Sequence, residues 1–288
     1  LYVANFIGNS MQVFDVSDPG IPTLVTSVPT ILPVSITISG GRAFVVNQDQ
    51  NLSVFDLGTP ASPALLGSVP TDLQPTSVAV NGDYAYVSHG NGATLMVYDV
   101  SDPSSMSLLS SLSVPIAPGS TVAIKDDHLY WVARTLSVVF DLSNPASPQF
   151  VTNPSWGGDH FTRSGDHLYV ASTLTDELIV VDVSNAAQPV VVATVPAGND
   201  PKSVAVAGNN AYLVSYSSNE LIVFDVSDPA SPLPRGSAAT GQPWYVTSDG
   251  EHAYVVSFNQ DLLTAFQVFC SQGLAVDLGS GQVAFEDP

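Results

Sequence analysis

The sequence predicts an all-β protein, a seven-bladed β-propeller built from four-stranded antiparallel blades. A motif returns about every 42 residues along the 288-residue chain. Each copy contains four short stretches rich in β-branched and aromatic residues, separated by Gly, Pro, Asn and Asp turns. No stretch of ten or more residues that lacks Gly and Pro shows the periodicity of a helix. Four-stranded units of this length, repeated around a centre, are typical of a β-propeller.

An aspartate at the end of the third predicted strand anchors each repeat. The segment Met-Gln-Val-Phe-Asp-Val-Ser-Asp-Pro at 11–19 returns with few changes at 95–103 and 221–229. Weaker copies fill the intervals, and the seventh copy has a glutamine where the aspartate belongs. The anchors are Asp15, Asp56, Asp99, Asp141, Asp182, Asp225 and Gln267. Seven copies fill the chain, so the whole of residues 1–288 is expected to form one propeller domain.

The strands of one repeat can be assigned in order. An inner strand such as 77–80 leads into the turn Asn-Gly-Asp at 81–83, and a second strand follows at 84–87. A polar loop then precedes the third strand, which ends at the anchor aspartate. After a Ser-Asp-Pro turn comes an outer strand such as 64–69. The chain opens within a second strand, and the divergent segment 270–288 is expected to help close the ring.

The repeated aspartates are interpreted as structural residues. One carboxylate per blade cannot converge on a single substrate, because the blades are spread around a ring. A short acceptor side chain before Ser-Asp-Pro suits a turn in which it binds backbone N–H groups. Gly82, Gly165 and Gly250 likewise mark hairpin turns that require a positive φ, and His128, His167 and His252 fall at or beside such turns.

Composition excludes several classes of function. The chain has 6 basic and 26 acidic residues, a net charge of −20, yet only 11% of its residues are charged. Basic residues are scarce, which excludes a nucleic-acid-binding protein and a polybasic membrane anchor. No apolar run reaches the ~20 residues that a transmembrane helix needs. The single cysteine, Cys270, allows no intrachain disulfide.

Departures from the repeat indicate where a ligand would bind. The inner strands open with small residues in early blades but with Asp159–His160, Lys202–Ser203 and Trp244–Tyr245 in later ones. Aromatic rings beside a few polar groups are what a small-molecule or glycan pocket needs. The predicted ligand-binding residues are Trp156, Asp159, His160, Lys202, Trp244 and Tyr245. The alternative is that these large side chains only fill the channel, with Lys202 paired to an acid.

The repeat resembles a known family. Leu-Ile-Val-Val-Asp-Val-Ser at 178–184 and the related stretch 221–232 look like the LVIVD repeat, while 195–206 with 211–214 is similar to the YVTN repeats of surface-layer propellers. The resemblance covers residues 1 to about 268. It implies a prokaryotic cell-surface or secreted protein and supplies no catalytic residues.

Three functions are therefore open. The first is a non-enzymatic extracellular or cell-surface propeller that serves as a structural scaffold or binds a protein or glycan. The second is a self-assembling subunit of a filament or surface layer, joined by strand addition at an incomplete blade. The third is a lactonase-like hydrolase whose candidate cluster contains Asp159 and His160. No metal-binding, nucleotide-binding or nucleophile motif is found, so no cofactor, metal or catalytic residue is predicted.

Overall fold

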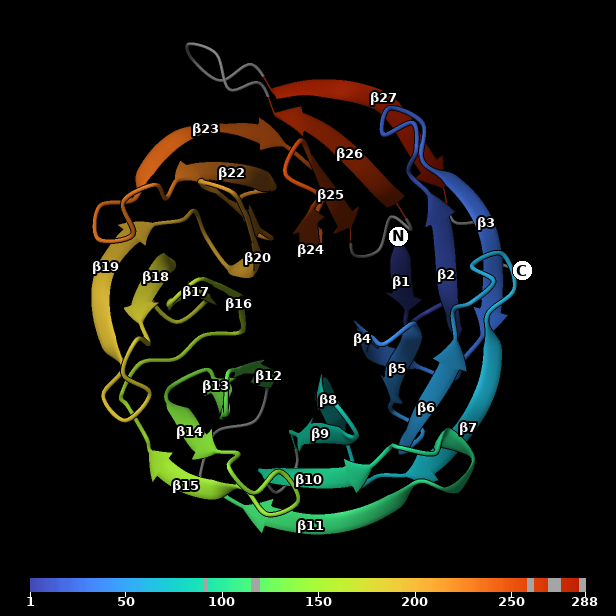
Figure 1. Ribbon diagram of the computed structural model, residues 1–288. Coiled ribbons are helices and arrows are strands. Elements are labelled where there is room, and N and C mark those ends of the chain that lie inside the picture. The colour runs from blue at the N-terminus through green and yellow to red at the C-terminus, as the bar shows by residue number, and fades with distance from the viewer. Residues whose placement is uncertain (91–92, 115–119, 258–261, 269–275, 285–288) are drawn as a thin grey trace. The chain divides into compact units, whose positions relative to one another are not determined.

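The chain folds into seven antiparallel β-sheets, the blades of a seven-bladed β-propeller (Figure 1). The computed structural model describes residues 1–90, 93–114, 120–257, 262–268 and 276–284. Cys270 lies outside these residues. The described part contains one short 3₁₀-helix, η1 (Pro103–Ser105), and no helix of the length and apolarity needed to cross a membrane. Contacts divide the chain into two compact units, which are described separately.

The first unit contains four sheets and covers Leu1–Asp15 and Leu24–Ser155. In three of them the strand order follows the sequence from inner to outer strand, and the first sheet has three described strands. The strands are β1 (Tyr2–Asn5), β2 (Ser10–Asp15) and β3 (Thr23–Pro29); β4 (Pro33–Ser39), β5 (Arg42–Asn47), β6 (Asn51–Asp56) and β7 (Ala64–Pro70); β8 (Pro75–Asn81), β9 (Tyr84–His89), β10 (Thr94–Asp99) and β11 (Ser107–Ser113); β12 (Ser120–Lys125), β13 (His128–Ala133), β14 (Ser137–Asp141) and β15 (Gln149–Thr152).

The second unit contains three four-stranded sheets within Trp156–Asp287, and Val16–Thr23 also belongs to it. Part of the divergent segment 270–288 forms its last strand, which pairs antiparallel with β26. The strands are β16 (His160–Ser164), β17 (His167–Ser172), β18 (Glu177–Asp182) and β19 (Val190–Pro196); β20 (Pro201–Ala207), β21 (Asn210–Ser215), β22 (Glu220–Asp225) and β23 (Leu233–Ala239); β24 (Pro243–Ser248), β25 (His252–Ser257), β26 (Leu262–Val268) and β27 (Val276–Ala284). Whether the segment closes the ring stays a prediction.

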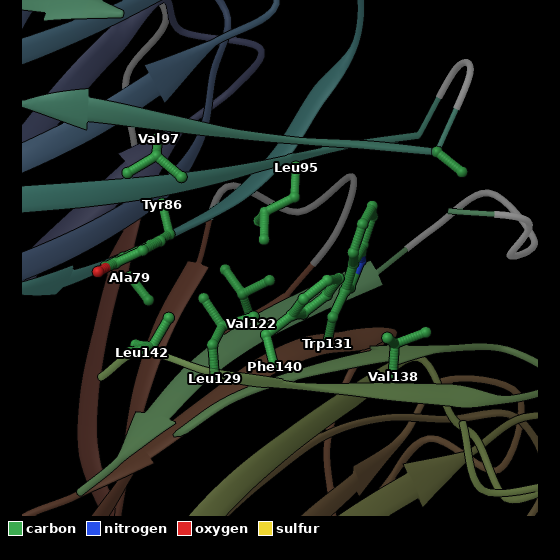
Figure 2. Close-up of a cluster of buried hydrophobic side chains, with 11 residues drawn as sticks. Ala79, Tyr86, Leu95, Val97, Val122, Leu129, Trp131, Val138, Phe140 and Leu142 are labelled. Atoms are coloured by element: carbon green, nitrogen blue, oxygen red, sulfur yellow. The ribbon is translucent and has the colours of Figure 1, made fainter. Parts of the chain in front are cut away.

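Apolar cores lie between neighbouring sheets of each unit. Figure 2 shows one of them, where Tyr86, Leu95 and Val97 of one sheet face Leu129 and Trp131 of the next. All five side chains are fully buried. The Tyr86 hydroxyl donates a hydrogen bond to the carbonyl oxygen of Pro145 at 3.0 Å, so its one polar group is satisfied. Alternation along the middle strands places such side chains on both faces of a blade, which explains why these strands read as apolar runs.

The structure confirms the structural interpretation of the anchor aspartates. In five blades the Oδ1 atom of the anchor aspartate accepts a hydrogen bond from the backbone N–H two residues later, a serine in four of them and Gly58 in the other. The acceptors are Asp56, Asp99, Asp141, Asp182 and Asp225. The pKa of Asp99 is lowered first by the hydrogen bond from the Ser101 hydroxyl and then by this backbone bond, and the pKa of Asp141 is lowered first by the Ser143 backbone bond, because these donors favour the charged carboxylate. The predicted positive φ is found at Gly82, Gly165 and Gly250.

Candidate functional site

The six predicted ligand-binding residues all belong to the second unit. Trp156 and Asp159 lie in the segment before β16, and His160 is the first residue of β16. Lys202 lies near the start of β20, while Trp244 and Tyr245 lie near the start of β24. The inner strands β16, β20 and β24 are neighbours in the unit, so they bring together residues more than eighty positions apart in the sequence.

His160 occupies a position that has a repeated structural role. In the first unit the Ser77 hydroxyl accepts a hydrogen bond from the N–H of Val122 on the next inner strand, at 3.3 Å. In the second unit Ser203 accepts one from Val246 at 3.3 Å. His160 does the same through Nδ1, which accepts from the N–H of Val204 at 3.4 Å. The imidazole therefore replaces a serine hydroxyl as the acceptor that joins adjacent inner strands.

This hydrogen bond fixes the state of the imidazole. Because Nδ1 accepts, the ring proton of neutral His160 is on Nε2. Burial lowers the pKa of His160 to about 4, so the ring is uncharged at neutral pH. The ring also meets Tyr245 edge to face, with the centroids 5.1 Å apart and the planes at 79°. Tyr245 keeps 46% of its surface exposed and is the part of this pair that a ligand could touch.

Asp159 is held by the loop that follows β17. Its carboxylate accepts hydrogen bonds from both the hydroxyl and the backbone N–H of Thr173, the latter at 3.2 Å. Its own N–H donates to the carbonyl oxygen of Ala171 at 2.9 Å. The Asp159 carboxylate therefore ties the start of β16 to this loop. Trp156, next to it in the same segment, is only 8% exposed and presents little surface to a ligand.

Lys202 forms an ion pair at the edge of the aromatic residues. Its Nζ lies 2.6 Å from Oδ1 of Asp200, and the side chains are 16% and 31% exposed. Asp200 has a positive φ of 60°. Its backbone N–H donates to Oδ1 of Asp176 at 2.8 Å, and the Ser217 hydroxyl donates to its Oδ2 at 3.3 Å. The loops therefore hold Asp200 in place from two sides, and Asp200 in turn orients Lys202.

Lys202 also lies against two aromatic rings. Its Nζ is 5.2 Å from the ring centroid of Trp244 and 6.0 Å from that of Tyr216, within the range of a cation–π interaction. Tyr216 and Trp244 meet edge to face, with the centroids 5.8 Å apart and the planes at 89°. Trp244 still exposes 45% of its surface. We call Asp200, Lys202, Tyr216 and Trp244 the Trp244 cluster.

Tyr216 is a member of this cluster that the sequence reasoning missed. It directly follows β21, the second strand of its blade, where other blades have Gln48, Gly90, Arg134 or Thr173. It is not among the residues that the departures at the start of the inner strands indicate. At this loop position the sequence has aromatic residues in three blades, Phe6, Tyr216 and Phe258, so the pattern marks Tyr216 as a candidate but does not single it out.

The geometry gives little support to a general base at Asp159 or His160. Nδ1 of His160 already accepts a hydrogen bond from Val204, and Nε2 carries the proton. The carboxylate of Asp159 is engaged by Thr173. Among the described residues, no group of three or more His, Cys, Asp or Glu side chains is arranged to hold a metal ion. The exposed groups are instead the rings of Trp244 and Tyr245.

The seven repeated sheets define this chain as a β-propeller. The chain belongs to the LVIVD repeat family, whose model matches residues 1–30, 34–71, 75–114, 119–154, 163–196 and 198–240. No curated protein matches the sequence.

Several solved structures share the fold. The periplasmic gluconolactonase PpgL of Pseudomonas aeruginosa superposes with a TM-score of 0.81 at 15% identity, over 99% of this chain and 97% of that one. A putative 6-phosphogluconolactonase from Bacteroides uniformis gives 0.82 at 15% identity, over 97% and 93%. A functionally unknown protein from Desulfotomaculum acetoxidans gives 0.78 at 13%, over 97% and 96%. At these identities the likeness shows the fold alone.

Proposed function

We propose that this propeller is a non-enzymatic binding protein that recognises a carbohydrate through the Trp244 cluster and Tyr245. The observation that carries the proposal is the exposure of Trp244. A large ring that folding alone required would be covered, whereas this ring is 45% exposed and is held in one orientation by Tyr216 and Lys202. A location outside the cell or at its surface, expected from the family resemblance, is part of the same proposal.

The cluster has the chemistry that a sugar ring needs. A pyranose presents C–H groups on one face, which pack against an indole, and hydroxyl groups around its edge. Asp200 supplies acceptor oxygens and Lys202 supplies donors at the edge of Trp244. These polar groups already bind each other, so they are held in place before a ligand arrives, which reduces the entropy cost of binding.

Tyr245 provides a second contact for a longer ligand. It follows Trp244 directly in β24, and its ring is 46% exposed and oriented by the edge-to-face contact with His160. Two neighbouring aromatic residues suit a ligand of more than one sugar unit. We therefore expect affinity to rise with chain length from a monosaccharide to a tetrasaccharide.

Intrinsic fluorescence offers a direct binding assay. The chain has three tryptophans, and Trp131 and Trp156 are buried, so Trp244 is the one that solvent or a ligand can reach. Titration with cello-, malto-, xylo- and chito-tetraose should change the emission for at least one of them. Trp244→Ala, measured by calorimetry, should lose about tenfold or more in affinity, while Trp244→Phe should keep most of it.

The matched control is Phe150→Ala on the outer strand β15, which removes another exposed aromatic side chain, 59% exposed. It should leave sugar affinity unchanged, and neither Ala variant should shift the melting temperature much, because exposed side chains contribute little to folding. If none of the four tetrasaccharides binds, or if the Phe150 variant loses as much affinity as the Trp244 variant, the proposal is wrong.

The gluconolactonases among the similar structures support a second candidate, a hydrolase of sugar lactones. Lactone hydrolysis needs a group that activates water, whereas Oδ2 of Asp159 and Nδ1 of His160 already accept hydrogen bonds from backbone N–H groups. We expect the rate of δ-gluconolactone hydrolysis to equal the uncatalysed rate. A rate that depends on protein concentration and falls in His160→Ser would favour the hydrolase instead.

A further inference from the structure

The charges around the Trp244 cluster bear on which sugars it accepts. Lys202 is the one cationic member of the cluster, and its Nζ already lies 2.6 Å from a carboxylate oxygen of Asp200. Asp176 lies next to this pair, since its Oδ1 binds the backbone N–H of Asp200 at 2.8 Å. The two carboxylates outweigh the single ammonium, so the local charge is negative.

No other described contact compensates this charge. Arg235, a second basic residue of the same unit, is on the outer strand β23 and is paired with Asp225. Arg163 lies further along β16, three residues beyond His160. A phosphate group is usually held by several donors from Arg, Lys or backbone N–H groups. Here the one ammonium is shared with the carboxylate of Asp200, which also accepts a hydrogen bond from the Ser217 hydroxyl, while the Asp176 carboxylate binds the backbone N–H of Asp200.

We infer that Asp200 is a specificity-determining residue: by neutralising Lys202, it makes the site accept uncharged sugars and reject phosphorylated ones. This inference rests on the proposed function for its ligand, but the charge selection itself can be measured without any sugar. Under this inference the ligand preference of this chain differs from that of any protein whose substrate is a phosphosugar. Similarity of fold alone does not show such a difference.

The first experiment measures the field at Trp244 with charged quenchers. Iodide, caesium and acrylamide quench exposed tryptophan as an anion, a cation and a neutral molecule, and a negative field concentrates the cation. Relative to free N-acetyltryptophanamide, caesium should quench the native protein better than iodide. Asp200→Asn should raise the iodide-to-caesium ratio by about twofold, as expected for one charge a few ångströms away in screened water.

Asp228→Asn is the matched control, since it removes the same charge from a turn of the same unit. Asp228 accepts a hydrogen bond from the N–H of Ala230, which asparagine can also do. Asparagine also tolerates the positive φ of Asp200, so the test variant should fold. Equal ratios in the two variants, or a native protein that iodide quenches better than caesium, would overturn the inference.

The second experiment compares methyl β-D-glucopyranoside with glucose 6-phosphate by Trp244 emission. The native protein should bind the phosphosugar about tenfold more weakly or not at all. Asp200→Asn should reduce the difference in affinity between the neutral sugar and the phosphosugar, and Lys202→Gln should increase it. A native protein that binds glucose 6-phosphate as well as the neutral sugar would refute the charge selection and leave sugar binding intact. If neither monosaccharide binds, the quenching ratios still decide the inference, and the tetrasaccharide titration decides the proposed function.

Discussion

His160 shows how one residue can serve folding while looking like a catalytic group. An imidazole beside an aspartate suggests acid–base chemistry in a sequence. In the structure its Nδ1 accepts the Val204 N–H just as Ser77 and Ser203 accept the corresponding N–H groups of their neighbours. His160 differs from these serines in one further contact: its imidazole ring meets Tyr245 edge to face and orients it.

Substitution of His160 should separate these two roles. His160→Ser restores the side chain found at this position in three other blades, at Ser35, Ser77 and Ser203, and should fold as stably as the native protein at pH 7. His160→Ala leaves the Val204 N–H without its acceptor and should cost about 1 kcal/mol more in the free energy of unfolding. Urea denaturation measures both. Equal stability of the two variants would show that the hydrogen bond contributes nothing.

The same residue predicts a pH dependence of stability. The pKa of His160 is about 4 in the folded chain, against about 6.5 for an unperturbed histidine. Between these values the unfolded chain binds more protons, so the free energy of unfolding falls as pH drops from 6.5 towards 4. Allowing for partial exposure of the ring, the native protein should lose about 1–2 kcal/mol more than His160→Ser between pH 7 and pH 4.5. Parallel losses in the two proteins would refute the lowered pKa.

The outer strands share a feature that protects their edges. Each of the five outer strands β7, β11, β15, β19 and β23 shifts register once against its partner, at the same place in the blade. Such bulges twist an edge strand and interrupt its free N–H and C=O groups, which discourages pairing with another chain. These outer strands are therefore unfavourable sites for adding a strand from another subunit. Self-assembly as a function of this chain stays a prediction.

Gly67 on β7 marks a close approach between two blades. A Cβ atom there would clash with the carbonyl oxygen of Pro103 in η1. Gly67→Ala should therefore force β7 and η1 apart and cost roughly 1–3 kcal/mol of unfolding free energy. The equivalent residue on β11 is Ser110, whose hydroxyl donates to the carbonyl oxygen of Ala146 at 2.8 Å.

Ser110→Ala provides the control for Gly67→Ala. Alanine fits the equivalent place on β19, where the chain has Ala193, so this variant should lose only a single exposed-side hydrogen bond, about 1 kcal/mol or less. Thermal unfolding monitored by circular dichroism would compare the two. If Gly67→Ala melts at or above the temperature of Ser110→Ala, the contact with η1 is not tight.

The strands could be predicted because the signals for them are local and repeated. Gly82 and Asp99 each specify a turn within a few residues of themselves, and the other blades have equivalents of both. The Trp244 cluster could not be predicted as a whole, because it depends on which loop lies over which inner strand. Tyr216 reaches Trp244 and Lys202 from a different strand, and no short-range pattern connects the three.

For the molecule as a whole, the net charge of −20 predicts a dependence on salt. Carboxylates repel one another in the compact state, and the Debye length falls from about 30 Å at 0.01 M salt to about 8 Å at 0.15 M. The melting temperature at pH 7 should therefore rise over this range of NaCl, by scanning calorimetry. Sucrose at the same osmolarity does not screen charges, so it should raise the melting temperature less than NaCl does. An unchanged or lower melting temperature in salt would show that paired charges dominate.

The hydrogen bond from an inner strand to a side chain of the preceding inner strand, found at three described junctions, has a consequence for how such chains originate. At these junctions the earlier repeat supplies the acceptor, Ser77, His160 or Ser203, and the next repeat supplies the donor N–H. If a gene segment encoding such a repeat is copied in tandem, the new copy adds one hydrogen-bond donor and one acceptor. Each of them finds a partner in a neighbouring copy. Growth by duplication therefore keeps these hydrogen-bonding groups paired at every step. Later substitutions, such as those at His160 and Trp244, then make single blades different from the rest.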